Sequence, residues 1–175
     1  EVAGIPLEDY VRGVVAGEMP PAFELEALKA QAIAARTYAV RRLLGGAKGD
    51  LPPEAAVADS EADQMYVSDA ELREKWGMFE YARHMEKVAR AVKETEGLIL
   101  TYEGEPIEAV FFAMSNGFTE NSEEVWQEAL PYLRSVPSPW EERYAPDFER
   151  ETAVEIREFY RKMGLPVSSK APDIT

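Results

Sequence analysis

The sequence predicts an α+β fold in which an N-terminal helix pair packs with a small antiparallel hairpin and further helices. Two segments near the N-terminus, 7–18 and 24–44, carry apolar or alanine residues at helical spacing. Two apolar segments, 98–102 and 106–114, flank a Glu-Gly turn, which is typical of a β-hairpin. Because the helical segments precede and follow the hairpin instead of alternating with strands, the predicted class is α+β.

The 175 residues are expected to form a single domain, 1–175. Apolar residues make up 46% of the chain, a proportion that argues against disorder. Within this domain we expect a flexible loop at 45–64, where Gly, Pro and Ala are frequent, and a peripheral helical segment at 137–175. The chain begins at Glu1 without a methionine, so we expect it to be a piece of a longer protein.

The ends of the first two helices are marked by proline and glycine. The helix at 7–18 follows Pro6 and must stop at the double proline at 20–21, since proline cannot continue a helix. The helix at 24–44 has acidic residues at its start and arginines near its end, which suits the helix dipole, and the glycine pair at 45–46 ends it.

Capping patterns mark the helices that follow. Residues 64–67 are predicted to form a short strand. Ser68 and Glu71 have the spacing of a capping box for a helix to about Trp76, and 80–95 reads as the next helix.

A second capping pattern lies near the C-terminus. Thr152 and Glu155 predict a capping box for a last helix, which Gly164 and Pro166 end. Its predicted apolar face comprises Ile156, Phe159, Tyr160 and Met163.

The composition excludes several kinds of site. Without cysteine the chain has no disulfide, no thiolate metal ligand and no cysteine nucleophile. Its one histidine, His84, cannot supply a His-rich metal site, and a Ser-His-Asp triad would have to use it. No pattern in the sequence calls for a cofactor, and we expect none.

The charge distribution narrows the choice of partners. A net charge of −14 argues against nucleic acid. Residues 1–44 carry five basic and six acidic residues, so most of the negative charge lies in 45–175. The nearly neutral first quarter could meet an anionic ligand, although composition alone favours a solvated helical surface of mixed charge.

Glu18 is the candidate general acid. It lies at the C-terminal end of the first predicted helix, where unpaired carbonyls and the helix dipole disfavour an ionised carboxylate. Apolar neighbours would disfavour the charge further by desolvation. A glutamate that keeps its proton can donate it to a leaving group. The alternative, favoured by local spacing alone, is a surface glutamate that tolerates a poor position.

The second predicted helix offers Arg36 and Gln31 as candidate substrate-binding residues. Arg36 is a long cation in an alanine-rich stretch, from which it can reach a ligand or a facing carboxylate. The alternative for Arg36 is an ion pair with a neighbouring acid, which these residues alone favour.

The polar loop 115–121 follows an apolar strand and is a candidate sugar-binding edge. The alternative is a structured turn followed by a helix N-cap at Asn121 or Ser122. The candidate substrate-binding residues are Ser115, Asn116, Gly117, Thr119 and Glu120, with Trp126 as a stacking platform.

Four blocks of the chain carry a family likeness. They are PLEDYVRGVVAGEMPPAFELEALKAQAIAARTYAV (6–40), DSEADQMYV (59–67), GLILTYEGEPIEAVFFAMSNGFTENSEEVW (97–126) and PYLRSV (131–136). In this order, over roughly residues 5–136, the chain resembles the stage II sporulation protein D family.

The resemblance implies a lytic transglycosylase that cleaves peptide-stripped glycan strands of the bacterial cell wall during engulfment. The family's catalytic glutamate falls in an E-M-P triplet, which here begins at Glu18. The family's polar S-x-G-x-T-E-N loop matches the loop that ends at Asn121. Some members bind zinc through a histidine and a cysteine, but this chain has Ala113 and no cysteine in those places, so we expect no metal.

The resemblance also implies partners and a location. Such proteins work with a cell-wall amidase and a membrane scaffold protein, outside the cytoplasmic membrane, tethered by an N-terminal anchor that we expect to lie outside this sequence. Family members usually continue past the point where this chain ends, so we expect part of the full domain, or its closing strands, to be missing.

One protonated glutamate suffices for this reaction, because the muramyl 6-hydroxyl replaces the water of an ordinary glycosidase. Arg36 near Glu18 would hold the lactyl carboxylate of the substrate. Two other functions stay open: a two-carboxylate hydrolase with Glu120 as partner, and a glycan-binding or amidase-activating module without turnover.

Overall fold

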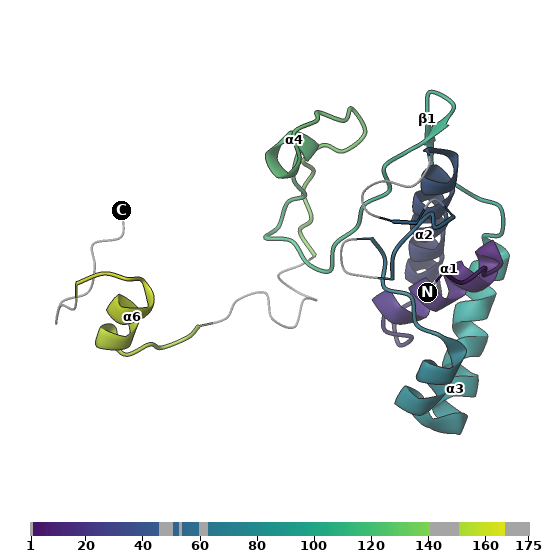
Figure 1. Ribbon diagram of the computed structural model, residues 1–175, viewed down its shortest axis with the longest axis horizontal. Helices are drawn as coiled ribbons and strands as arrows, with labels where there is room; N and C mark the ends of the chain where they lie inside the picture. The colour runs from purple at the N-terminus through teal and green to yellow at the C-terminus, as the bar shows by residue number, and fades with distance from the viewer. Residues whose placement is uncertain (1, 46–50, 53, 60–62, 141–150, 167–175) are drawn as a thin grey trace. The chain divides into compact units, whose positions relative to one another are not determined.

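The computed structural model describes residues 2–45, 51–52, 54–59, 63–140 and 151–166. The chain divides into two units, Glu1–Phe112 and Ala113–Thr175. Figure 1 labels the helices of both. Helices packed together and a small antiparallel sheet confirm the expected α+β class. The division into two units was not expected from the sequence, and a single domain over 1–175 stays a prediction.

Three helices build the first unit. Helix α1 spans Leu7–Glu18, α2 spans Leu25–Gly45 and α3 spans Asp69–Glu94. The bounds of α1 and α2 lie within one residue of those predicted, since the prolines at 20–21 separate the two helices as expected.

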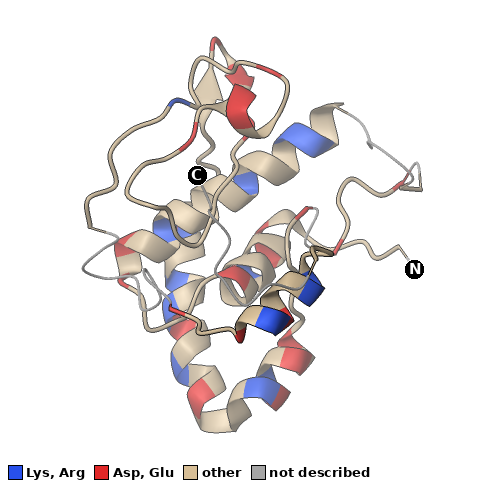
Figure 2. Cartoon of the chain, turned by 90° about the vertical axis from the view of Figure 1, so that its left-hand side faces the viewer, with Lys and Arg blue, Asp and Glu red and all other residues tan. Residues whose placement is uncertain are grey.

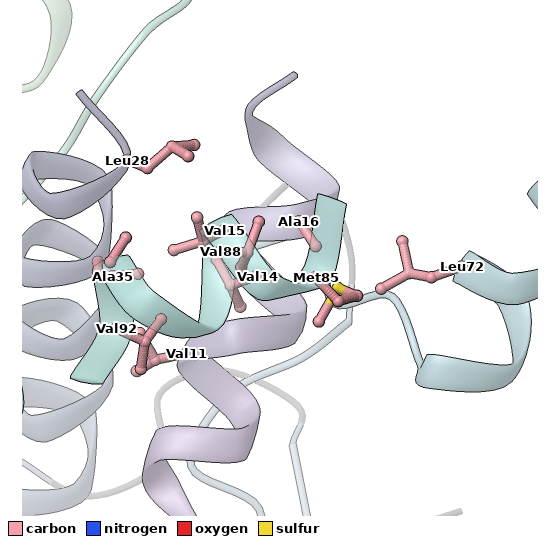
Figure 3. Close-up of a cluster of buried hydrophobic side chains, with 12 residues drawn as sticks. Val11, Val14, Val15, Ala16, Leu28, Ala35, Leu72, Met85, Val88 and Val92 are labelled. Carbon is pink, nitrogen blue, oxygen red and sulfur yellow. The ribbon is translucent and has the colours of Figure 1, made fainter. Parts of the chain in front are cut away.

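The core of the first unit lies between these three helices. Figure 3 shows side chains of all three helices gathered around a common centre. The valines of α1 meet alanines of α2, whose small side chains allow the helices to approach closely. Met19 also packs against this core, so the end of α1 that carries Glu18 is anchored to it. The buried members are Val11, Val14, Val15, Ala16, Leu28, Ala32, Ala35, Leu72, Met85, Val88, Ala91 and Val92.

Helix α3 contains the two helices that the sequence predicts as separate. Gly77 has φ 70° and ψ 162°, which breaks the helix at that residue. The predicted capping box is confirmed: Ser68 Oγ accepts from the Glu71 N–H at 3.3 Å, and the Glu71 carboxylate accepts from the Ser68 N–H at 2.8 Å.

The predicted hairpin exists but is much shorter than expected. Strand β1 spans Thr101–Tyr102 and pairs with β2, Glu105–Pro106, in antiparallel register. Glu103 and Gly104 at the turn have φ of 53° and 88°, as a type I′ hairpin turn requires. Turn chemistry therefore placed the hairpin correctly, while the lengths 98–102 and 106–114 were wrong.

Side chains of α2 make hydrogen bonds with backbone groups of the hairpin segment. In a longer hairpin, these backbone groups would pair with a strand. The Thr37 hydroxyl accepts from the Leu100 N–H at 2.9 Å, and Arg41 donates to the Pro106 carbonyl at 2.6 Å. Arg36 donates to the Leu98 carbonyl at 3.2 Å. Because buried or half-buried backbone groups need one good partner, the helix replaces a longer ladder here.

The segment before α3 is extended but is not the predicted strand. Within 63–67 only Gln64 makes a bridge, a single parallel one with Asp59. The rest of this segment lies along α1, where it takes part in the candidate site.

The second unit contains helix α4, Ser122–Val125, and helix α6, Ile156–Lys162. An isolated antiparallel bridge joins Phe118 to Pro137. The predicted polar loop therefore lies beside a later segment of its own unit. The expected flexible loop at 45–64 and peripheral segment at 137–175 fall partly outside the described residues.

The predicted capping box of the last helix is wrong. Glu155 is the N-cap of α6, no side chain caps this helix, and the helix begins at Ile156. Thr152 lies three residues before this N-cap, so it cannot reach the first free N–H groups of the helix. The predicted end is confirmed, because Gly164 has φ 65° and Leu165 N–H donates to the Tyr160 carbonyl.

Charged residues of both signs are interleaved along the helices (Figure 2). Several form pairs one turn apart, among them Arg83 with Glu80 and Arg90 with Glu94. In the part of the chain that the structure describes, no helix combines the length and the hydropathy needed to cross a bilayer.

Candidate active site

Glu18 is the last residue of α1, and its carboxylate is held by a backbone group from a distant segment. The Met65 N–H donates to Oε1 of Glu18 at 2.8 Å. Glu18 is half-buried and Met65 is exposed, so this pair lies at the surface of the first unit. Among the described residues no donor reaches Oε2, which leaves one carboxylate oxygen for another molecule.

Two glycines of α1 allow the 65–67 segment to come this close. At Gly17 a Cβ atom would lie 2.9 Å from the Met65 carbonyl oxygen. At Gly13 it would lie 2.9 Å from the Val67 carbonyl oxygen and closer still to the Tyr66 ring. The Val67 N–H also donates to the Gly13 carbonyl, at 3.4 Å. The glycine pair, one turn apart, therefore forms the face of α1 on which this segment lies.

A tyrosine of α1 also binds the segment. The Tyr10 hydroxyl donates to Oε1 of the buried Gln64 at 3.1 Å, and the Tyr10 ring stacks on Tyr66 with the centroids 5.8 Å apart. Burial, followed by the charge of Asp63, raises the pKa of Tyr10. Tyr10 therefore stays a neutral donor at physiological pH.

A second tyrosine, Tyr38 on α2, binds Asp63, the residue before Gln64. The Tyr38 hydroxyl donates to Oδ1 of Asp63 and accepts from Arg42 at 2.7 Å. Arg42 also lies 3.4 Å from Asp63 and stacks over the Tyr38 ring. Burial and the hydrogen bond to Asp63 raise the pKa of Tyr38 to about 12.

Arg36 takes the ion-pair alternative. Its side chain is 1% exposed, and it binds Glu8 through Nε at 2.8 Å and Nη2 at 2.7 Å. Its remaining donors point to the carbonyls of Ala32, Val92 and Leu98. Because protein acceptors take its donors, the guanidinium has none to offer a substrate carboxylate in this arrangement. This geometry supports no role for Arg36 in substrate binding.

Gln31 is also buried. It is 7% exposed, and within the described part of the chain its amide nitrogen has no acceptor. The structure records no contact between the buried Gln31 and Glu18. Its predicted role in binding stays a prediction.

In the second unit, side chains of the polar loop make hydrogen bonds with backbone groups of residues 134–136. Thr119 Oγ1 donates to the Arg134 carbonyl at 3.0 Å and accepts from the Val136 N–H at 2.8 Å. Asn121 is the N-cap of α4, but its side chain accepts from the Ser135 N–H at 3.0 Å. The structured turn with an N-cap at Asn121, the alternative for this loop, is therefore present.

Ser115 and Gly117 shape the start of this loop. Ser115 Oγ accepts from the Gly117 N–H at 3.1 Å, and Gly117 has φ 104°, a value that favours glycine. Of the predicted binding residues in this unit, Asn116, Glu120 and Trp126 have exposed side chains, Trp126 being 49% exposed.

The predicted site residues thus belong to different units. Glu18, Gln31 and Arg36 lie in the first unit, and the loop that starts at Ser115 and Trp126 lie in the second. The convergence of both sets on one groove stays a prediction.

Sequence reasoning missed the residues that hold Glu18. The Met65 N–H lies 47 positions away and has no side-chain signature, and Tyr38 and Asp63 looked like core and loop residues. One local signal was present: Gly13 and Gly17, four residues apart in a helix, mark a face that another backbone approaches.

His84 is half-buried on α3. Its ring lies edge-on to Trp76 with the centroids 5.0 Å apart, and Nε2 lies 3.4 Å from Glu80. The described residues include no group of three or more Asp, Glu or His side chains placed to hold a metal ion.

Comparison with known proteins identifies the family. A family model described as "Stage II sporulation protein" matches residues 1–102. Stage II sporulation protein D of Bacillus subtilis (strain 168) is 45% identical over 170 residues, which cover 97% of this chain and 49% of that protein. The protein of the same name from Bacillus amyloliquefaciens is 45% identical over 169 residues, covering 97% and 48%. An amidase enhancer of Bacillus subtilis is 37% identical over 123 residues, covering 70% of this chain and 14% of that protein.

The chain therefore spans about half the length of the stage II sporulation protein D relatives. The match to the family model covers more than half of the chain, and the likeness to both relatives runs through nearly all of it. The resemblance noted in the sequence is confirmed, and the chain belongs to the stage II sporulation protein D family of sporulation proteins.

Proposed function

We propose that this chain carries the catalytic glutamate of a peptidoglycan lytic transglycosylase, which cleaves peptide-stripped glycan strands and leaves 1,6-anhydromuramyl ends. Glu18 is the single general acid and base. The observation that supports this proposal is the geometry of its carboxylate, with Oε1 held by the Met65 N–H and Oε2 without a donor among the described residues.

The reaction needs one carboxyl group that first gives and then takes a proton. Protonated Glu18 donates its proton to the oxygen that bridges two sugars, and the bond from that oxygen to the anomeric carbon breaks. The 6-hydroxyl of the same muramyl sugar bonds to the anomeric carbon, and its proton passes to the Glu18 carboxylate. Since the nucleophile belongs to the substrate, no water and no second carboxylate are required.

The hydrogen bond from Met65 supports this role by fixing where the acid lies. A general acid must stay within hydrogen-bond reach of the oxygen that it protonates, and a glutamate at a helix end otherwise samples several rotamers. Oε1 is an acceptor in both protonation states, so the proton to be transferred sits on Oε2.

The test compares Glu18→Gln with a second carboxylate variant, Glu120→Gln, in the full-length protein. We expect Glu18→Gln to keep binding of peptide-stripped strands while the rate of cleavage falls by about 100-fold or more. Because Glu120 is a predicted substrate contact and not the acid, Glu120→Gln is expected to raise KM and to keep kcat close to normal. Loss of activity in both variants, with ordinary reducing ends as the normal product, would favour the two-carboxylate hydrolase.

A second candidate function is activation of an amidase without turnover. The similarity to a protein named as an amidase enhancer favours it, because that likeness covers 70% of this chain. Two measurements separate the candidates. An activating module raises the rate of a purified cell-wall amidase, and the Glu18→Gln variant does so as well as the wild-type protein. Such a module makes no new glycan ends by itself.

The place of action and the partners are proposals as well. We propose that the protein acts on the outer side of the cytoplasmic membrane, tethered to it, together with a cell-wall amidase and a membrane scaffold protein. An amidase removes peptides from glycan strands, so it would supply the peptide-stripped substrate. Accessibility of the protein to protease added to sporulating cells stripped of their wall tests the location.

A further inference from the structure

We propose that Tyr38 and Asp63 are positioning residues for Glu18: they fix the 63–65 segment so that the Met65 N–H stays on the Glu18 carboxylate. This inference rests on the proposed role of Glu18 for its catalytic part. Its structural part, the hold on the Met65 N–H, can be measured without any activity.

Three consecutive residues bind three different helical side chains. Asp63 binds Tyr38 of α2, Gln64 binds Tyr10 of α1, and Met65 binds Glu18 at the end of α1. A shift of this segment by one residue would break all three contacts at once. The contact at Glu18 therefore depends on the contact at Asp63, two residues earlier.

The Asp63 end is the most firmly held. Oδ1 of Asp63 accepts a hydrogen bond from the Tyr38 hydroxyl and lies 3.4 Å from Arg42. Oδ2 accepts from the Ala58 N–H at 2.8 Å. The side chain of Asp63 is 14% exposed and Tyr38 is 6% exposed. Hydrogen bonds to a charged group in a partly buried place are the strong ones, so this end resists displacement.

The Glu18 end is the weaker one. Met65 is exposed, and its contact with Glu18 is a single hydrogen bond at the surface. Such a bond competes with water and lasts only where the backbone that carries the N–H is already in place. Tyr38 is too deeply buried to touch a glycan strand, which makes it a positioning residue and not a catalytic one.

A matched pair of hydroxyl deletions on α2 tests the proposal. Tyr38→Phe removes the donor to Asp63 together with the acceptor of Arg42, and keeps the ring. Thr37→Val, at the next residue, removes the acceptor of the Leu100 N–H on the hairpin segment. Each variant deletes one hydroxyl that holds a different segment, so each serves as the control for the other.

The first readout is hydrogen exchange of two amides by NMR in the full-length protein. We expect Tyr38→Phe to raise the exchange rate of the Met65 amide by about tenfold or more and to leave the Leu100 amide unchanged. Thr37→Val is expected to do the reverse. An unchanged Met65 amide in Tyr38→Phe overturns the proposal, whatever the activity. Should Tyr38→Phe fail to fold, Asp63→Asn replaces it with the same expected and contrary results.

The second readout is cleavage of peptide-stripped glycan strands. With Glu18 mispositioned, kcat is expected to fall by about tenfold in Tyr38→Phe while KM stays the same, and Thr37→Val keeps the normal kcat. Faster exchange at Met65 with a normal kcat would overturn the positioning role. Absence of cleavage by the wild-type protein would overturn the proposed function instead, and the exchange result would still decide whether Tyr38 and Asp63 hold the Met65 N–H.

Discussion

Arg36 connects several parts of the first unit through one guanidinium group. It binds the Glu8 carboxylate on α1 and carbonyl oxygens of Ala32, Val92 and Leu98. These acceptors belong to α1, α2, α3 and the segment that leads to the hairpin. A buried arginine whose donors are all directed to the protein stabilises the fold, because leaving its partners unpaired costs free energy.

Arg36→Met tests this role, since it keeps the length of the stem and removes every donor. We expect the free energy of unfolding to fall by about 2–3 kcal/mol, below the full cost of breaking a buried pair because Glu8 is one third exposed. Urea unfolding followed by circular dichroism measures the change. The control is Arg83→Ala, an exposed pair expected to change stability by less than about 0.5 kcal/mol. Equal losses in both variants would contradict the structural role.

Helix α1 acts as a platform for the 65–67 segment. Its glycine face at Gly13 and Gly17 admits the backbone of that segment, and its last residue receives the Met65 N–H. The opposite face of the helix contributes the valines of the core. The helix thus links packing on one side to the candidate acid at its end.

Gly17→Ala separates helix propensity from close approach. The new methyl group would lie 2.9 Å from the Met65 carbonyl oxygen, a backbone atom that cannot turn away. We expect a loss of stability of about 1–3 kcal/mol together with a loss of cleavage. Gly45→Ala at the end of α2, where a Cβ meets nothing within 4 Å, is the control and should be neutral or slightly stabilising. Thermal unfolding of both variants decides, and a stabilised Gly17→Ala would refute the close approach.

Helix α4 is held by Arg134, which binds three neighbours. It donates to Glu123 at 2.8 Å, to Ser122 Oγ at 2.9 Å and to the Leu130 carbonyl at 3.0 Å. The hydrogen bonds from Arg134 lower the pKa of Glu123 to about 2. This geometry is local to the second unit and does not involve Glu18.

The order around α4 is therefore expected to depend on acidity. A carboxyl whose pKa is lowered by folding stabilises the folded form above its ordinary pKa of 4.5, and this contribution is lost as the pH falls toward 2. Amide exchange of residues 122–126 should lose protection over that interval in the wild type and show no such loss in Glu123→Gln. Protection that stays constant between pH 5 and pH 2, roughly the range of that titration, would count against the Arg134 contact.

At the scale of the whole molecule, local sequence patterns predicted most helices and the hairpin turn. They did not predict the tertiary contacts between these elements. Proline and glycine marked the bounds of α1 and α2, the Glu-Gly pair marked the turn at 103–104, and two helices were predicted where Gly77 breaks α3. The strand lengths were wrong because α2 side chains occupy the hairpin's backbone groups, a tertiary effect that no local pattern records.

The same limit applies to the candidate site. Glu18 stood out from its place at a helix end, but its partner is a backbone N–H 47 residues away. Arg36 and Thr119 were candidate substrate-binding residues, yet in the structure their donors bind acceptors within the protein. Residue type indicates what a side chain can bind, and the fold determines which partner it meets.

The most direct test of Glu18 as a lone acid and base is a digestion of peptide-stripped glycan strands in water labelled with heavy oxygen. Mass spectrometry of the new ends then shows which nucleophile attacked the anomeric carbon. For the wild-type protein we predict unlabelled anhydro ends, which are lighter than reducing ends by the mass of one water. For Glu18→Gln we predict no new ends. Labelled reducing ends, or normal cleavage by Glu18→Gln, would contradict the account.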